Sequence, residues 1–344
     1  RLDGIPLALE LAAARLRSLP LDHLITRLDD RFRLLTGGSR TALPRQRTLQ
    51  AALDWSYRLL QEDERMLLQR LSIFAGGWTL DAAEAVCVGA GLVMWQVLDL
   101  LTSLVEKSLV QLDPTAVGGR YWLLETVRQY ALERLAAVGE ETRTRDRHLQ
   151  FYVALAERAE RELGGPQRET WYARLDAERE NILLAFAHTR WAPGGGAAGL
   201  RLVHALLHWM VLREVELWLG VTVQALAHPD AQQADVARCR ALYVAATMST
   251  ATGRPAEGYA LAQSSAGIAR ACGDALELAE ALCRLGYAAL ELDRTADALE
   301  HLREGLELAR KSDKRGLIAA FSTGLGEVHS LQDQFELAEA AYLE

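Results

Sequence analysis

A pair of histidines is the first feature whose spacing suggests chemistry. His204 and His208 lie four residues apart, so a helix would place both imidazoles on one face, where they could hold a metal ion. The H-E-x-x-H pattern is absent and no third ligand is evident in the sequence. We therefore expect no metal site at these histidines.

Motifs for catalysis are missing from the sequence. It contains no G-x-x-x-x-G-K-[ST] loop to hold a triphosphate, no G-x-S-x-G nucleophile turn, and no Cys/His pair at a recognisable spacing. We therefore expect that this chain is not an enzyme and binds no cofactor by itself.

The composition favours stacked helices over sheets. Half of the 344 residues are apolar but only 7% are aromatic, and Ala and Leu dominate. The formal net charge is −8, and no segment carries the basic stripe that nucleic-acid binding requires. The four cysteines form no C-x-x-C pair, which predicts reduced, buried thiols in a cytoplasmic protein. The most apolar stretch, residues 202–212, is too short to span a membrane.

Residues 1–42 predict two short helices that end at a glycine turn. Pro6 lies near the first helical position, where its missing N–H would lack a partner anyway. The string GIPLALELAAARL resembles the Gly-x-Pro motif of the NB-ARC, or STAND-class, nucleotide switches. The resemblance implies that this is the end of an NB-ARC helical subdomain. It gives Gly4 and Pro6 the role of an adenine-side wall in a longer protein that binds ATP or ADP with Mg²⁺.

Residues 43–136 predict a winged helix. Apolar residues at helical spacing indicate four helices, of which Thr79 caps the third and the fourth covers about 94–107. Two apolar strings, 108–112 and 121–124, flank a Pro/Gly loop and predict a β-hairpin. The strings LLTSLVEKSLVQLD and RYWLLETVRQYALERL resemble the winged-helix domain of bacterial STAND regulators of the LuxR-type or SARP-like kind.

The helix in the recognition position argues against DNA reading. It carries Asp99 and Glu106 against Lys107 alone, and its other residues are mostly apolar, which predicts that they are core. We expect this domain to be a packing module and DNA to be contacted only through a domain outside this chain.

Residues 137–344 predict a truncated array of helical repeats. Leu285-Gly286 recurs as Leu325-Gly326, and Asp293 recurs as Asp333, which is a period of 40 residues. The phrase LGYAALELDRTADALEHLREGLELAR resembles a tetratricopeptide repeat, in which small residues such as Gly286 lie where two helices cross.

Two further expectations concern this region. The Gly-rich stretch 191–199 predicts a loop or a repeat boundary. The third repeat stops at Glu344 within a helix, so we expect the chain to be part of a longer protein.

Tetratricopeptide-like arrays present the first helix of each repeat along a concave face that binds extended peptides or small inducers. First-helix residues away from the apolar positions include two Arg and two Tyr, side chains that often anchor interfaces. These candidate partner-binding residues are Arg240, Tyr243, Arg284 and Tyr287. Ordinary surface residues are the alternative interpretation of this set.

The expected fold is mainly α: a helical subdomain, a winged helix with a small β-hairpin, and a tetratricopeptide-like α-solenoid. The resemblance implies the signal-sensing segment of a bacterial ATP-dependent transcriptional regulator, whose repeats bind an inducer or partner protein and which self-associates on activation. Two alternatives stay open. One is a repeat scaffold for protein–protein contacts without nucleotide control, and the other is the regulatory part of a signalling enzyme such as an adenylate cyclase or kinase.

Overall fold

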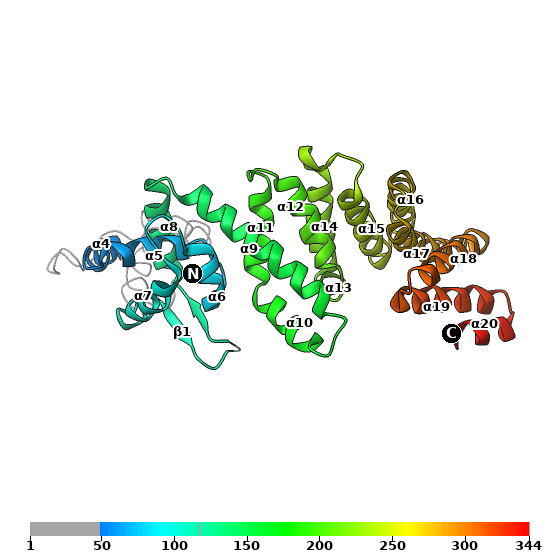
Figure 1. Ribbon diagram of the computed structural model, residues 1–344, viewed down its shortest axis with the longest axis horizontal. Helices are drawn as coiled ribbons and strands as arrows, with labels where there is room; N and C mark the ends of the chain where they lie inside the picture. Colours follow the sequence, from blue (N-terminus) through cyan, green and yellow to red (C-terminus); the bar gives the residue numbers. More distant parts are fainter. Residues whose placement is uncertain (1–48, 117, 344) are drawn as a thin grey trace, which may run out of the picture. The chain divides into compact units, whose positions relative to one another are not determined.

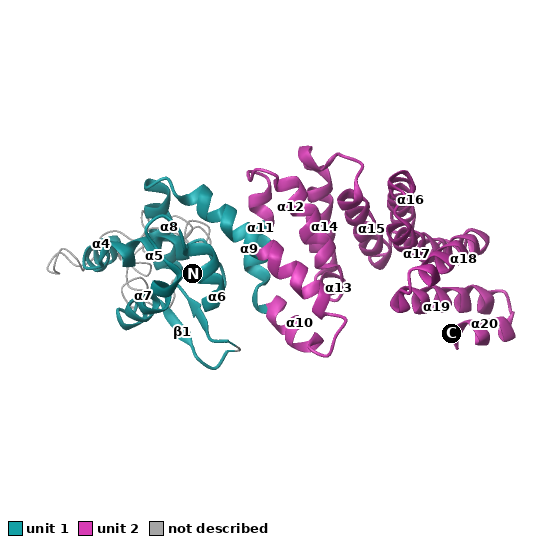
Figure 2. Cartoon of the chain, in the orientation of Figure 1, with its two compact units in different colours: residues 1–151, 177–185 teal, residues 152–176, 186–344 magenta. Residues whose placement is uncertain are grey.

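The computed structural model describes residues 49–116 and 118–343. In that part of the chain seventeen α-helices and one 3₁₀ helix accompany a single two-stranded hairpin (Figure 1), which confirms the prediction of a mainly α protein. The predicted helical subdomain over 1–42, with Gly4 and Pro6, lies outside the described residues. The chain divides into two compact units (Figure 2), each of which is described by itself.

Unit 1 consists of residues 1–151 and 177–185 and contains the predicted winged-helix elements. Its helix α5 contacts α6, α7 and α8, and buried side chains such as Leu67, Phe74 and Leu101 form the core between them. The elements are α4 (Leu49–Arg58), α5 (Glu62–Leu71), α6 (Leu80–Cys87), α7 (Met94–Glu106), β1 (Gln111–Asp113), β2 (Arg120–Trp122) and α8 (Glu125–Ala137).

The predicted cap and hairpin are both present in unit 1. The Thr79 hydroxyl accepts a hydrogen bond from the backbone N–H of Ala82, so Thr79 is the N-cap of α6. Strands β1 and β2 pair antiparallel, and Trp78 adds a bridge to Tyr121 through two backbone hydrogen bonds of 2.8 and 2.9 Å. Gly77 has a φ of +91°, and a Cβ there would lie 2.5 Å from the carbonyl oxygen of Tyr121. Glycine is therefore required at this approach to the wing.

A segment distant in sequence completes unit 1. The Asn181 side chain accepts a hydrogen bond from the N–H of Ala75 and donates one to the carbonyl of Gly77, each of 2.8 Å. Arg120 of β2 pairs with the buried Glu178 at 2.7 Å. Residues 177–185 thus belong to the winged-helix unit because their polar side chains satisfy backbone groups around its wing.

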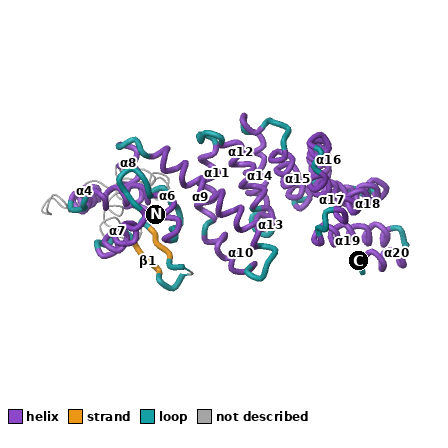
Figure 3. The backbone as a smooth tube through the Cα atoms, in the orientation of Figure 1, coloured by secondary structure: helices purple, strands orange, loops and turns teal. Residues whose placement is uncertain are grey.

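Unit 2 consists of residues 152–176 and 186–344, and short turns join its helices (Figure 3). Helices α9, α10 and α11 contribute residues to both units. The helices that supply unit 2 are α9 (Glu141–Glu162), α10 (Arg168–Ala177), α11 (Arg179–Thr189), α12 (Gly195–Ala205), α13 (Leu207–Val211), α14 (Val215–Ala227), η3 (Pro229–Ala231), α15 (Val236–Ala251), α16 (Pro255–Cys272), α17 (Ala275–Glu291), α18 (Thr295–Lys311), α19 (Arg315–Leu331) and α20 (Phe335–Tyr342).

The last six helices form three consecutive pairs, α15 with α16, α17 with α18 and α19 with α20. The turn inside each pair has one residue of positive φ, namely Gly253 at +75°, Asp293 at +58° and Asp333 at +59°. Asp adopts this left-handed conformation more readily than most residues with a side chain. The predicted recurrence of Asp293 as Asp333 is therefore a recurrence of backbone conformation.

Gly286 lies where the sequence places it, at the crossing of two helices. A Cβ at this position of α17 would lie 2.5 Å from Cδ2 of Leu302 on α18. Gly326 of α19 is equally close to the Tyr342 ring of α20, at 2.4 Å. Each glycine admits a large side chain from the second helix of its pair, which keeps the pair closely packed.

Of the two predictions for 191–199, a loop or a repeat boundary, the loop is wrong for the second half of the stretch. Helix α12 begins at Gly195, and Gly195, Gly196 and Gly199 are all buried within it. A Cβ at Gly195 would lie 1.8 Å from the carbonyl oxygen of Thr189, and one at Gly196 would lie 3.0 Å from the backbone nitrogen of Ala231. These glycines let the helix approach neighbouring backbone and do not break it.

The cysteine prediction holds for three residues out of four. Cys87, Cys239 and Cys283 are buried free thiols, whereas Cys272 is exposed at the end of α16. Cys272 occupies the last helical position of α16, where the chain turns into Gly273.

Candidate ligand-binding groove

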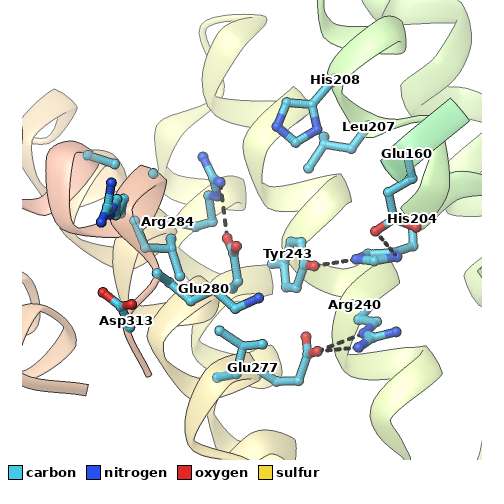
Figure 4. Close-up of a pocket in the computed structure, with 16 residues that line it drawn as sticks. Glu160, His204, Leu207, His208, Arg240, Tyr243, Glu277, Glu280, Arg284 and Asp313 are labelled. Atoms are coloured by element: carbon cyan, nitrogen blue, oxygen red, sulfur yellow. Dashed lines mark hydrogen bonds and ion pairs between the residues drawn. The ribbon is translucent and has the colours of Figure 1, made fainter. Parts of the chain in front are cut away.

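A groove of about 820 Å³ in unit 2 could hold a ligand. Its lining comes from α15, α17 and α19, the first helices of the three pairs, together with α9, α12 and α13 (Figure 4). Ligand pockets of small molecules occupy about 300–1,000 Å³. The groove is therefore of a size that suits a small molecule.

Three of the four predicted binding residues meet in this groove. Arg240 and Tyr243 come from α15, and Arg284 comes from α17. Tyr287 does not line it: the Tyr287 hydroxyl donates a hydrogen bond of 2.8 Å to the carbonyl of Ala320, and its ring packs against the core of the repeats. The structure thus separates Tyr287 from the other three.

Tyr243 differs from the predicted surface residue because it is only 3% exposed. Its hydroxyl is 2.6 Å from Nε2 of His204 on α12, and the two rings meet edge to face. The Nδ1 atom of His204 lies 3.5 Å from the Glu160 carboxylate of α9. Tyr243 therefore belongs to the floor of the groove and connects three helices.

His204 and His208 both line the groove. No cluster of three or more His, Cys, Asp or Glu residues that could hold a metal exists in residues 49–116 and 118–343. Burial, assisted by the charges of Arg240 and His208, lowers the pKa of His204 to about 4. Burial, with help from Arg284, also lowers the pKa of His208. Both imidazoles are neutral at pH 7.

Two ion pairs lie along the groove, one between α15 and α17 and one within α17. Both Nε and Nη2 of Arg240 contact Oε1 of Glu277, at 2.7 and 2.6 Å. Arg284 contacts Glu280 at 3.3 Å, one turn earlier on α17. The other Glu277 oxygen, Oε2, and the Nε atom of Arg284 are buried without a hydrogen-bond partner among the described residues. Such atoms are uncommon in native proteins and need an explanation.

Burial raises the pKa of both Glu160 and Glu277, and nearby carboxylates raise both further. For Glu160 these neighbours include Glu277, so the two carboxylates feel each other. Arg240 opposes the shift at both residues. The positive charge of Arg240 thus stabilises the ionised form of two partly buried carboxylates.

The opposite side of the groove is basic. Lys314 and Arg315, at the start of α19, are exposed and line it beside Asp313, whose φ is +47°. Arg284 points into the groove from α17 (Figure 4).

Several groove residues were missed by the sequence reasoning, and some had a readable signal. Glu277 and Glu280 precede the predicted Arg284 at the spacing i, i+3, i+7, which places all three on one helical face. Glu160 had no such signal because it lies on α9, more than a hundred positions from Glu277.

The exposed face of α7 was predicted only in part. Val97, Leu101 and Leu104 are buried as expected, but Trp95 is 74% exposed and Leu98 is 46% exposed. Lys107 pairs with Glu64 rather than extending outward alone. The outer face of this helix is therefore apolar and acidic, because only one stripe of its apolar residues reaches the core.

None of the helices in the described ranges is long and apolar enough to cross a membrane.

Comparison with known proteins identifies a winged helix-turn-helix domain in this chain. Residues 60–136 match the family model for a winged helix-turn-helix domain. Over 330 residues the chain is 39% identical to Rv0890c of Mycobacterium tuberculosis (strain ATCC 25618 / H37Rv), a protein named as an HTH-type transcriptional regulator. That alignment covers 92% of this chain and 36% of the relative. The protein Rv0894 of the same strain is 46% identical over 143 residues, or 41% of this chain and 36% of that protein.

Two solved structures show weaker likeness. The STAND protein PH0952 of Pyrococcus horikoshii, with a tetratricopeptide repeat sensor, has a TM-score of 0.37 at 15% identity, covering 97% of this chain and 58% of that one. A Rap protein complexed with competence and sporulation factor has a TM-score of 0.41 at 12% identity, covering 85% and 75%. The chain is thus a homologue of HTH-type transcriptional regulators, contains a winged helix-turn-helix domain, and spans about a third of the curated relatives that it matches.

Proposed function

We propose that this chain is the signal-sensing segment of a bacterial HTH-type transcriptional regulator and that the groove of unit 2 is its inducer site. The observation that carries the proposal is the pair of unpartnered buried atoms, Oε2 of Glu277 and Nε of Arg284, in a groove of ligand size. A buried polar atom without a partner costs about 1–3 kcal/mol. A ligand that binds these atoms would recover that free energy.

The chemistry of the lining favours recognition over packing. Charged side chains from α9, α15, α17 and α19 converge on one space, and both histidines there are neutral. Convergent polar groups in a concave space are typical of a specific small-molecule site. The homology to HTH-type regulators supports a transcriptional output for the longer protein.

The role of nucleotide in that longer protein is part of the same proposal. Its basis is the resemblance of the N-terminal string to the Gly-x-Pro motif of STAND-class switches, which assigns ATP or ADP with Mg²⁺ to a domain outside this chain. We propose likewise that the longer protein contacts DNA through another domain and self-associates on activation. This chain itself would then carry no catalytic step.

The proposal is tested by a thermal-shift screen of residues 1–344 against sugars, nucleotides, amino acids and short peptides. An inducer at 100 times its Kd should stabilise the chain by about 2.7 kcal/mol. Arg315→Ala, at the exposed edge of the groove, should weaken that stabilisation, whereas Arg303→Ala, exposed on α18 outside the groove, should not. Stabilisation by a compound that is equally strong in both variants and in the unaltered chain would place its site elsewhere.

A further inference from the structure

The charges of the groove are unevenly distributed along it. Near α9 and α15, Arg240 is the lining cation beside two lining acids, Glu160 of α9 and Glu277 of α17, and His204 there is neutral. On the side of α19 the cations Lys314 and Arg315 accompany Asp313. The first side has a surplus of negative charge and the second a surplus of positive charge.

Glu277 shows that the acidic side of the groove lacks a hydrogen-bond donor. Its side chain is 4% exposed, and Arg240 uses both of its contacting nitrogens on Oε1. Oε2 is left without a hydrogen bond. A buried carboxylate oxygen is a strong acceptor, and a donor that carries positive charge gives it the strongest available hydrogen bond.

We propose that the groove binds a zwitterionic ligand, such as a short peptide, whose primary ammonium contacts Glu277 and Glu160 and whose carboxylate contacts Lys314 and Arg315. This inference rests on the proposed function and names the ligand class of the same site. A primary ammonium has three N–H donors and no acceptor, which suits a site of carboxylate oxygens. A neutral sugar would leave the surplus charge on both sides unbalanced.

The proposal also sets the pH dependence of binding. Burial raises the pKa of Glu160 and of Glu277, so these acids become protonated at a higher pH than exposed glutamates do. The charged groups that act on the two acids are Arg240, Arg161, Glu157, Asp274 and Glu280. Tyr243 and His204 lie beside them, and the pKa of His204 is about 4. Affinity for an ammonium should therefore fall as the pH falls from neutral, before His204 becomes charged.

The experiment is affinity selection with mass spectrometry on residues 1–344, using three equimolar tripeptide mixtures: free-ended, N-acetylated and C-amidated. The chain should retain free-ended peptides, and N-acetylation should weaken retention about tenfold, the equivalent of one charge-assisted hydrogen bond. Glu277→Gln should give a similar loss with an unchanged far-ultraviolet spectrum. Glu304→Gln, an equivalent change on α18 outside the groove, should have no effect.

The outcomes separate this inference from the proposed function. Equal retention of acetylated and free-ended peptides, or unaltered binding by Glu277→Gln, would overturn the zwitterionic ligand. If no tripeptide binds but a sugar or nucleotide binds and Arg315→Ala weakens it, the groove is an inducer site of other chemistry and only the ligand class fails. If no compound in either experiment depends on the groove residues, the proposed function fails as well.

Discussion

Arg70 in unit 1 and Arg284 in unit 2 are both arginines within helices, and their surroundings differ sharply. Arg70 is 1% exposed, contacts Glu140 through Nε and Nη2 at 2.8 and 3.1 Å, and donates to the carbonyls of Cys87, Gly89 and Ala90. Arg284 has one contact of 3.3 Å, to Glu280, and an unpartnered Nε. The same side chain fixes a loop in one unit and leaves hydrogen-bonding capacity unused in the other. The hydrogen bonds of Arg70 stabilise the fold of unit 1, whereas the unpartnered Nε of Arg284 is consistent with the ligand site that we propose.

The largest expected effect on stability comes from replacing Arg70. Arg70→Ala would leave Glu140 and three carbonyl groups without their donors, so we expect the free energy of unfolding of unit 1 to fall by about 4 kcal/mol. Urea denaturation followed by tryptophan fluorescence measures it. Arg284→Ala is the matched comparison and should cost far less. Equal losses in the two variants would remove the distinction between the two arginines.

A second variant tests whether the damage stays within one unit. Gly286→Leu would place a side chain where Leu302 lies, so we expect a loss of about 3 kcal/mol through overpacking. Hydrogen exchange should increase across α15–α20 and stay unchanged in α5–α8, because repeats are coupled to their neighbours. Gly267→Ala is the control, since a Cβ there meets nothing within 4 Å. Equal loosening of both units would contradict their independence.

The third prediction concerns the pH dependence of unit 2. The pKa of His204 is lowered to about 4 when the chain is folded, against about 6.5 when it is unfolded, so the unfolded chain binds the proton more tightly. The stability from a neutral His204 is therefore complete above about pH 6.5 and is lost as the pH falls toward 4. The loss should be about 3 kcal/mol by pH 4. In His204→Gln the curve of unfolding free energy against pH should be flatter over this range, and an unchanged curve would refute the assignment.

The smallest effect distinguishes Tyr287 from the groove residues. Tyr287→Phe removes only the hydrogen bond to Ala320, so we expect about 1 kcal/mol of lost stability and no change in ligand affinity. Thermal denaturation and the tripeptide selection measure the two quantities. Weaker ligand binding by this variant would return Tyr287 to the binding face on which the sequence placed it.

The sequence predicted the fold where local signals decide it. Thr79, the β-hairpin and the 40-residue period depend on spacing along the chain, and each appears in the structure. The helix that begins at Gly195 was missed because its glycines are required by the backbone of Thr189 and Ala231, which only the folded chain brings near.

For the groove, the sequence predicted which helices carry the residues but not the direction of each side chain. Arg240, Tyr243 and Arg284 could be placed on first helices from the repeat, but helical spacing does not say toward which neighbour a side chain turns. Tyr287 is three residues beyond Arg284 and reaches α19 instead. Glu160 comes from a helix outside the repeat, so no period could have found it.

The recurring positive φ at Gly253, Asp293 and Asp333 has a consequence for how this array could change in length. Each turn returns the chain to the same conformation after forty residues, so one helix pair is a complete structural module. A duplication or deletion of forty residues between equivalent turns should preserve the stacking of its neighbours, whereas an insertion of any other length would displace every later side chain on the groove face. Such an array could lengthen or shorten its groove by whole modules.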